Sequence, residues 1–172
     1  MTEQASQEYI IMPCGIRDEM NIPYNWGAGD FVGKFLEELR DNERIYANKC
    51  PHCGRYHLPP RIVCGRCHVE MEGFDKWVEV GPKGTVLLFT ITMTPFLNPG
   101  TGKPRQVPYT IATIQLDGAP AAFEHLLEET QPDKLFIGMR VEAMFTPGHE
   151  RKGDLRDIRY FRTISTEIKE NR

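Results

Sequence analysis

Two short motifs decide the fold of this chain: Cys50-Pro51-His52-Cys53-Gly54 and Cys64-Gly65-Arg66-Cys67-His68. Each contains a CxxC pair, and ten residues separate Cys53 from Cys64. A CxxC turn directs both sulfurs at one point, so two such turns supply the four thiolates of a tetrahedral zinc site. The sequence therefore predicts one structural zinc ion per chain, held by Cys50, Cys53, Cys64 and Cys67.

The spacing of the two pairs also predicts local structure. Ten residues are fewer than in the commonest four-cysteine pattern, but they suffice for a short hairpin with a metal-binding turn at each end. Gly54 directly follows the first pair, at a position that often needs a positive φ. A site closed by four thiolates has no open position for a catalytic water, so the metal would be architectural. Iron would fit the same ligands and change only the ion.

Other uses of these cysteines fit the sequence less well. Disulfides would need an oxidising compartment, and a redox CxxC normally belongs to a thioredoxin-like βαβ unit, which the sequence lacks. The second motif also matches the CxxCH signature of haem attachment, but that assignment leaves the first pair unexplained. We expect the nearby histidines to be surface or supporting residues and the fifth cysteine to be an unpaired thiol. These residues are His52, His57, His68 and Cys14.

Length and charge limit the class of protein. With 172 residues the chain forms one domain or two small ones. Its formal net charge of −3, with acidic and basic residues interspersed, argues against a protein that mainly grips nucleic-acid backbones. No apolar run is long enough to cross a bilayer, and residues 1–6 do not resemble a secretory signal. We therefore expect a cytoplasmic protein with no membrane partner.

The N-terminal part divides into an arm and a helix. Residues 1–29 mix prolines and glycines with large apolar side chains, which predicts an irregular arm that packs on its own domain or lies along a partner. Asp30 is predicted to cap a helix that ends near Asn42. The apolar face of this helix carries Phe31, Phe35, Leu36 and Leu39. We expect this face, like the arm, to contact other parts of a complex.

The rest of the chain has the pattern of a β-protein. Segments around the cysteine pairs predict a zinc ribbon, and five later segments rich in β-branched and aromatic residues predict strands. Asp117-Gly118 predicts a two-residue turn between the second and third of these strands. The predicted strands are 84–92, 109–116, 119–127, 141–145 and 155–163. Five short strands predict a small closed barrel, for which the oligonucleotide/oligosaccharide-binding (OB) fold is the best match.

These elements predict a mainly β chain with three parts. They are the arm over residues 1–29, a helix and zinc ribbon over 30–73, and an OB-fold domain over 74–172. Two loops, 94–107 and 147–153, lie where OB-folds bind their ligands, and the first is long enough to be functional without regular structure.

The order of these parts resembles a known family. Besides the helix and the cysteine pairs, the matching motifs are Pro108-Tyr109, Leu116-Asp117-Gly118-Ala119 and Ile137-Gly138-Met139-Arg140-Val141. Over roughly residues 30–165 the chain resembles the rubredoxin-like zinc ribbon plus OB-fold proteins that accompany acyl-CoA enzymes, once catalogued as a domain of unknown function. Within that family it resembles the zinc-finger subunit of benzoylsuccinyl-CoA thiolase.

The resemblance implies a non-catalytic accessory subunit. The implied complex cleaves benzoylsuccinyl-CoA with CoA to benzoyl-CoA and succinyl-CoA in anaerobic toluene degradation. Its other component would be a thiolase-fold catalytic subunit, in a heterotetramer or larger assembly that binds a CoA thioester. The residues agree, because thiolysis needs a cysteine nucleophile with a base, and this sequence shows no such pair and no other catalytic motif.

Two other functions stay open. A zinc ribbon followed by an OB-fold also occurs in nucleic-acid-binding proteins, in which aromatic side chains stack on bases. The candidate platforms are Phe89, Tyr109, Phe123, Tyr160 and Phe161, most of which we expect to face the barrel core. The third possibility is a free-standing acyl-CoA-binding protein.

The loop at 94–107 carries the candidate substrate-binding residues. It is braced by prolines and contains Lys103 and Arg105. A guanidinium can meet a carboxylate with two parallel hydrogen bonds. We expect Arg105, with Lys103 as the second choice, to bind an anionic group at the entrance of the partner's active site. The alternative is a solvated loop whose charges have no such role.

Overall fold

Two sheets and one helix make up the part of the chain that the computed structural model describes, residues 27–97 and 102–164. The first sheet has the strand order β2-β1-β3, and the second is a closed barrel in the order β4-β5-β6-β8-β7. The elements are α1 (Gly29–Asn42), β1 (Ile45–Lys49), β2 (Tyr56–His57), β3 (Val78–Val80), β4 (Lys83–Thr92), β5 (Tyr109–Leu116), β6 (Ala122–Leu127), β7 (Arg140–Phe145) and β8 (Ile158–Thr163), with 3-10 turns η1 (Phe74–Lys76), η2 (Pro132–Lys134), η3 (Gly148–Glu150) and η4 (Leu155–Asp157). The prediction of a mainly β chain with one helix and a five-stranded barrel is confirmed.

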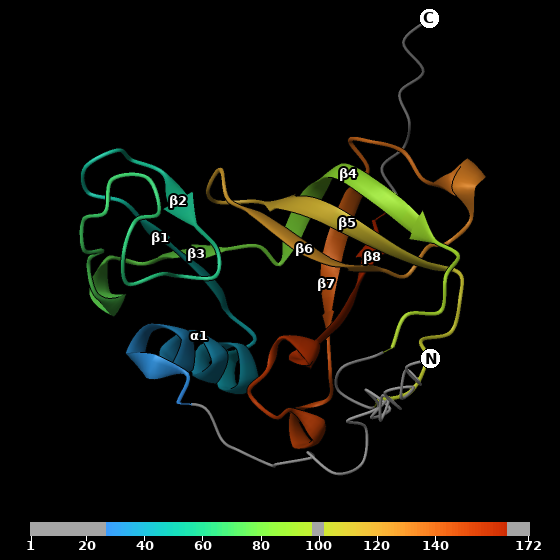
Figure 1. Cartoon of the computed structure of the whole chain (residues 1–172), viewed down its shortest axis with the longest axis horizontal. Coiled ribbons are helices and arrows are strands. Elements are labelled where there is room, and N and C mark those ends of the chain that lie inside the picture. The colour runs from blue at the N-terminus through green and yellow to red at the C-terminus, as the bar shows by residue number, and fades with distance from the viewer. Residues whose placement is uncertain (1–26, 98–101, 165–172) are drawn as a thin grey trace, which may run out of the picture.

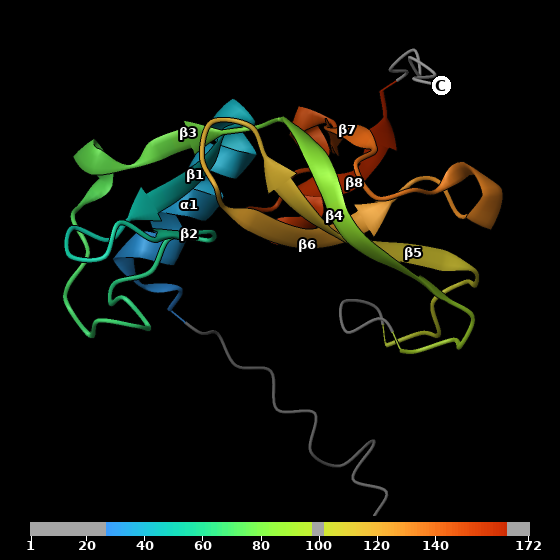
Figure 2. The same cartoon turned by 90° about the horizontal axis from the view of Figure 1, so that it is seen from above.

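Figure 1 shows the small sheet at one end of the molecule and the barrel at the other, with α1 beside the small sheet. At right angles, Figure 2 shows β3 running from the small sheet straight into β4 of the barrel. β3 pairs antiparallel with β1, from Ile45 opposite Val80 to Ala47 opposite Val78. The segment after η1 therefore completes the ribbon sheet before the barrel begins at Lys83. The division of the chain between residues 73 and 74 stays a prediction.

The start of α1 differs from the prediction. Ala28 is the N-cap and makes no side-chain hydrogen bond, so the prediction that Asp30 caps the helix is wrong. A capping residue lies outside the helical backbone, whereas Asp30 already belongs to the first turn of the helix. Its negative charge interacts favourably there with the positive end of the helix dipole. The predicted end at Asn42 is confirmed. Within the described residues no helix, α1 included, has the length and apolar composition of a membrane span.

The apolar face of α1 packs inside the chain. Phe35 and Leu39 are 0% exposed and belong to one core that continues through the small sheet into the barrel. Phe31 and Leu36 pack against that core, and Phe31 also contacts the smaller core around the cysteines. The expectation that this face contacts other parts of a complex is wrong for Phe35 and Leu39, because the chain itself covers them. The arm, up to residue 26, lies outside the described residues.

The connection between β5 and β6 is longer than predicted. The two strands are antiparallel, as expected, but their ladder runs only as far as Gln115 opposite Ala122. Asp117 does not start a two-residue turn, because its N–H donates to the Lys83 carbonyl and its own carbonyl accepts from another residue of the β3–β4 corner. Pro120 has no N–H to give to a ladder. The turn therefore widens, and the third barrel strand begins at Ala122 instead of 119.

Candidate metal centre and binding face

The four cysteines of the two motifs come together at the tip of the ribbon. Their sulfur atoms all lie within 4.8 Å of one another, and the sulfurs of Cys53 and Cys64 are 3.8 Å apart. All four are free thiols; Cys50 and Cys64 are buried, and the other two are half-buried. This is the arrangement that a tetrahedral ion with four thiolate ligands requires.

The two CxxC turns share one backbone design. The Gly54 N–H donates to the carbonyl of Cys50 (3.0 Å), and the His68 N–H donates in the same way to the carbonyl of Cys64 (2.9 Å). Both donors have left-handed backbones, with φ of 69° at Gly54 and 56° at His68. The expected positive φ at Gly54 is confirmed. The equivalent strain at His68 could have been found by aligning the second motif with the first.

His68→Gly is expected to stabilise the metal-loaded chain by up to about 1 kcal/mol, because glycine avoids the cost of a side chain in the left-handed region. For the same reason Gly54→Ala should destabilise it by about 1 kcal/mol. Gly65→Ala is the control, since Gly65 lies in the second turn without a positive φ, and an added Cβ would make only an ordinary contact with the Arg61 side chain at 3.9 Å. Urea unfolding with saturating metal measures all three. A His68→Gly chain less stable than the parent would contradict the prediction.

The electrostatics of the cluster call for a cation. The backbone N–H groups of Cys67 and Arg66 point at the Cys64 sulfur and lower the pKa of this thiol to about 5. The neighbouring sulfur of Cys53 is the largest of the causes that raise the pKa of Cys67 to about 12. Without added positive charge, one thiol thus ionises readily while another is held protonated. A zinc ion supplies that charge, so the donor set fits a structural zinc.

Residues around the cluster support it. Asn48, 1% exposed, donates from its side-chain amide to the Arg61 carbonyl (2.8 Å) and accepts from the Arg61 N–H (3.2 Å). These two hydrogen bonds close the hairpin between the two turns. The sequence analysis did not predict them. The available signal was an amide side chain among the apolar residues of β1, because buried polar groups need hydrogen-bond partners. His57 helps to lower the pKa of Cys64, as a supporting residue would. His52 and His68 are exposed, as expected.

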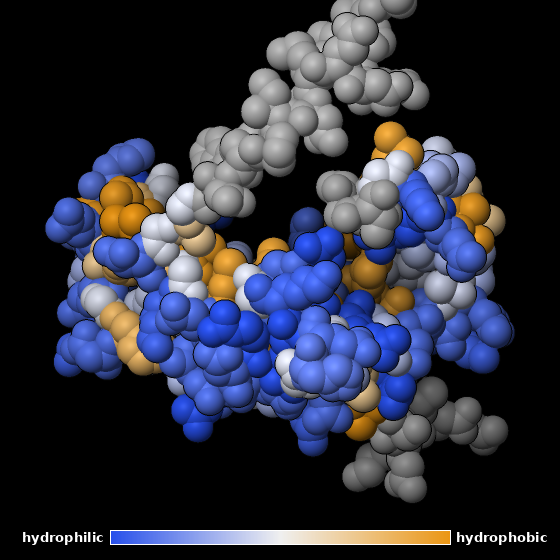
Figure 3. Space-filling view, turned by 90° about the horizontal axis from the view of Figure 1, so that it is seen from below, coloured by the Kyte–Doolittle hydropathy of each residue, from blue (hydrophilic) through white to orange (hydrophobic). Residues whose placement is uncertain are grey.

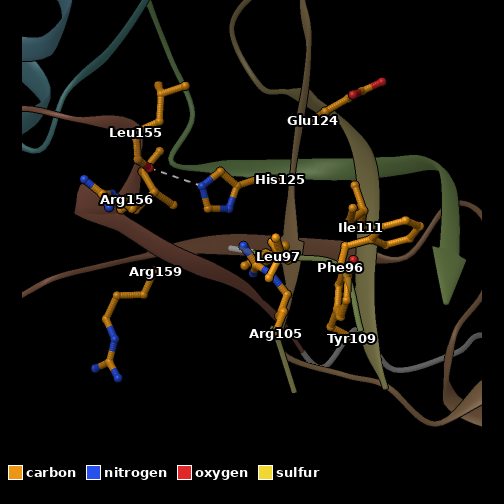
Figure 4. A pocket seen from close by; sticks show the side chains of 12 residues that line it. Phe96, Leu97, Arg105, Tyr109, Ile111, Glu124, His125, Leu155, Arg156 and Arg159 are labelled. Atoms are coloured by element: carbon orange, nitrogen blue, oxygen red, sulfur yellow. Dashed lines mark hydrogen bonds between the residues drawn. The ribbon is translucent and has the colours of Figure 1, made fainter. Parts of the chain in front are cut away.

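A second candidate site is a cavity of about 550 Å³ on the barrel, shown in Figure 4. Its walls come from β5, β6, the start of β8 and the loop at 94–107. Arg105 lies in this wall, with its guanidinium 5.1 Å from the centre of the Tyr109 ring. Lys103 is exposed and does not line the cavity. The structure therefore brings Arg105, and not Lys103, to the cavity; the substrate role of either residue stays a prediction.

The loop at 94–107 has more structure than expected. Leu97 and Pro104 form an isolated antiparallel bridge, and the Arg105 N–H donates to the Phe96 carbonyl (2.8 Å). The two sides of the loop thus run together and place apolar side chains beside Arg105 at the mouth of the cavity. The expectation of a loop without regular structure is wrong here. Pro104 has no N–H of its own to extend the pairing.

His125 bridges the inner end of the cavity. Its Nε2–H donates to the Leu155 carbonyl (3.2 Å), and its ring stacks on Phe123 with a centroid distance of 5.5 Å. Burial lowers the pKa of His125, which agrees with a neutral ring that donates from Nε2. The sequence offered one signal, because alternation along β6 puts His125 on the same inward face as Phe123 and Leu127. Of the five candidate stacking platforms, Phe123 and Phe161 are buried in the barrel, whereas the other three are half-buried.

The loop at 147–153 connects the barrel to α1. The Arg151 side chain, 10% exposed, donates from Nη1 to the Arg40 carbonyl (2.8 Å) and pairs with Glu43 at the end of the helix. Asp157, 2% exposed, accepts a hydrogen bond from the Gly153 N–H (2.8 Å) and so fixes the loop. The Arg151 side chain is thus engaged with its own chain, whereas His149, Glu150 and Lys152 are exposed; the expectation that this loop flanks a binding face stays a prediction. The partners of Arg151 are distant in sequence, so no local pattern indicated them.

Comparison with known proteins relates the chain to characterised domains. A rubredoxin-like zinc ribbon domain of ChsH2 matches residues 38–72, and a C-terminal OB-fold domain of ChsH2 matches residues 77–146. A DUF35 domain-containing scaffold protein of Methanocaldococcus jannaschii is 30% identical over 114 residues, which cover 66% of this chain and 76% of the relative. A protein of the same description from Pyrococcus furiosus is 29% identical over 114 residues, with the same coverage of 66% and 76%.

Solved structures share the fold. An Ltp2-ChsH2(DUF35) aldolase superposes with a TM-score of 0.52 at 22% identity, covering 80% of this chain and 98% of that one. A DUF35 family protein of unknown function from Sulfolobus solfataricus gives a TM-score of 0.50 at 22% identity, with coverage of 78% and 84%. At this level of identity the match concerns the fold alone.

Proposed function

Because the chain belongs to the DUF35 family, whose zinc ribbon and OB-fold it carries, we propose that it is a non-catalytic, zinc-binding accessory subunit of an acyl-CoA thiolase complex. Two relatives are described as scaffold proteins, and one structural neighbour is an Ltp2-ChsH2 aldolase. The complex would cleave benzoylsuccinyl-CoA with CoA as a step of toluene degradation. This reaction would take place in the cytoplasm. Its catalytic subunit would have the thiolase fold, in a heterotetramer or larger assembly that binds the CoA thioester.

An exposed apolar surface at the barrel end carries this proposal. Met93, Phe96 and Leu97 are 70%, 61% and 64% exposed. Leu88 and Ile111 are exposed on the outer face of β4 and β5, because Thr90 pairs with Ile111 and follows Leu88 on the same face, and Ile111 lines the same cavity as Phe96 and Leu97. We call Leu88, Met93, Phe96, Leu97 and Ile111 the rim patch. Figure 3 shows apolar surface at the barrel end, separated by hydrophilic surface from the ribbon end. Apolar surface of this kind marks an interaction site.

The chemistry is assigned to the partner. Within the described residues every cysteine belongs to the metal cluster, and Cys14 lies outside them. His125, the histidine of the cavity, donates to a backbone carbonyl instead of to a nucleophile. The isolated chain is therefore proposed to be inactive towards acyl-CoA thioesters. Turnover by the purified chain that disappears in Cys14→Ser would overturn this assignment.

Reconstitution with a purified benzoylsuccinyl-CoA thiolase catalytic subunit tests the proposal. We expect the two chains to co-elute in size-exclusion chromatography with light scattering. Phe96→Glu should weaken binding at least about tenfold. It removes an aromatic side chain that the contact would bury, and it adds a charge there. Ile62→Glu is the matched control, because Ile62 is 54% exposed at the ribbon end, away from the rim patch. A chain that stays monomeric beside the catalytic subunit rejects the proposal.

A kinetic prediction concerns Arg105. Arg105→Ala should raise the KM of the assembled complex roughly ten- to a hundredfold, the effect of losing one charge-assisted hydrogen bond of about 1.5–3 kcal/mol. Lys103→Ala should have a smaller effect, and Arg66→Ala, at an exposed ribbon position, should have none. Steady-state kinetics with the complex checked for integrity by light scattering makes the measurement. Unchanged kinetics in an intact complex would show that the loop at 94–107 does not bind the substrate.

A further inference from the structure

The barrel has one nearly open seam. In the described part of the chain, β6 and β8 pair in parallel only at Leu127 opposite Phe161. By contrast, the other edge of β6 pairs with β5 along its whole length, from Ala122 to Leu127. β8 lies next to β6 in the barrel, but in the described residues the β8-side edge of β6 forms no further ladder pair with it.

The backbone groups at this edge can be assigned from the hydrogen bonds that flank them. The Glu128 N–H donates to a β8 carbonyl (2.9 Å). Because backbone groups alternate between the two edges of a strand, those of Ala122 and Glu124 face the same side as those of Glu128. The opposite edge agrees, since the Leu116 N–H donates to the Ala121 carbonyl (3.2 Å), which assigns odd-numbered residues to β5. The N–H and C=O groups of Ala122 and Glu124 thus face the open seam.

The seam borders the cavity of Figure 4. Ile111 of β5 and its ladder partner Leu126 of β6 give one wall an apolar character, and the opposite wall runs from Leu155 to Arg159. The Arg159 guanidinium lies 5.8 Å from the centre of the Tyr160 ring and forms no ion pair with any residue in the described ranges. Figure 4 shows Arg159 extended away from His125, and the cavity is also lined by Glu124. Three arginines (Arg105, Arg156 and Arg159) and one carboxylate line the cavity, so the charge beside the seam is mainly positive.

We propose that an extended segment of the catalytic partner, carrying a carboxylate, adds to β6 as an extra strand along this seam. An unpaired strand edge is a template for a further strand, and backbone hydrogen bonds supply affinity in such additions. The segment would place apolar side chains against Ile111 and Leu126 and its carboxylate beside Arg159. The rim patch at the cavity mouth would continue the same contact. This inference rests on the proposed accessory function and names the surface through which it acts.

A backbone substitution gives the sharpest test. Glu124→Pro removes the N–H that faces the seam and leaves the β5 ladder its bonds, whereas Glu124→Ala removes only the side chain. Titration calorimetry with the purified catalytic subunit should show at least a tenfold loss of affinity for Glu124→Pro and less than a twofold change for Glu124→Ala. Arg159→Glu should also weaken binding at least tenfold. Equal affinities for Glu124→Pro and Glu124→Ala would falsify the strand addition.

Hydrogen exchange on the unmodified proteins keeps the test independent of how Glu124→Pro folds. In the complex, the amides of Ala122 and Glu124 should exchange at least tenfold more slowly than in the free chain, and the Ile62 amide should not change. A complex that forms without added protection at Ala122 and Glu124 overturns this inference and leaves the accessory function standing. Failure of the unmodified chain to bind the catalytic subunit overturns both.

Discussion

Cys64→Ser is expected to release the metal and to unfold the zinc ribbon. Structural zinc contributes about 10–16 kcal/mol of apparent free energy in small peptides. The ribbon has little to replace it, because its own buried core consists of Cys50, Cys64 and Met71. The barrel belongs to the larger core, which contains none of the cysteines, and it should keep its strands. Elemental analysis should show a fall from one metal ion per chain to nearly none, and hydrogen exchange should show loss of protection over β1 and β2.

The fifth cysteine provides the control for this change. Cys14→Ser removes a thiol from outside the described residues and should leave one metal ion per chain. Metal loss should also follow acidification, because binding displaces thiol protons and Cys67, whose pKa its neighbours raise to about 12, must lose its own. Full metal content in Cys64→Ser would show that the four-cysteine site is wrong. Iron in place of zinc would keep the ligands and change the ion.

The second large effect is expected at the contact between barrel and helix. Arg151→Ala should destabilise the chain by about 3 kcal/mol, because it removes a charged donor from several acceptors, two of which are backbone carbonyls. The lost contacts include the Arg40 carbonyl at 2.8 Å, the Thr146 carbonyl at 2.7 Å and the pairing with Glu43. A cation at the C-terminal end of a helix also complements its dipole. Urea unfolding followed by circular dichroism measures the loss.

Lys152→Ala is the matched control for Arg151→Ala. Lys152 is the next residue in the loop and is exposed, so its removal should change stability by less than about 0.5 kcal/mol. Metal content should stay at one ion per chain in both variants, which separates this effect from that of Cys64→Ser. Equal stability of the Arg151→Ala and Lys152→Ala chains would show that the contact does not hold the helix to the barrel.

The metal centre could be predicted from the sequence because its geometry is local. Each CxxC turn fixes its two sulfurs within five residues, and ten residues between the pairs leave only a hairpin to join them. The buried face of the helix and the barrel strands could be predicted in the same way. The spacing of Phe35 and Leu39 and the runs of β-branched residues indicate which side of each element is buried. The order of these parts was then enough to indicate the family.

The structure alone decided what depends on pairing between distant segments. Pro120 and the bonds of Asp117 to the β3–β4 corner widened a turn that Asp117-Gly118 favours in isolation. Arg151 contacts Arg40 and Glu43 across more than a hundred residues, and the ladder between β6 and β8 has a single pair in the described residues. A sequence pattern gives the period and the exposed side of each element. It does not give the register or the neighbour, because these are set by the closing of the whole barrel, and the open seam of β6 exists only once that closure is complete.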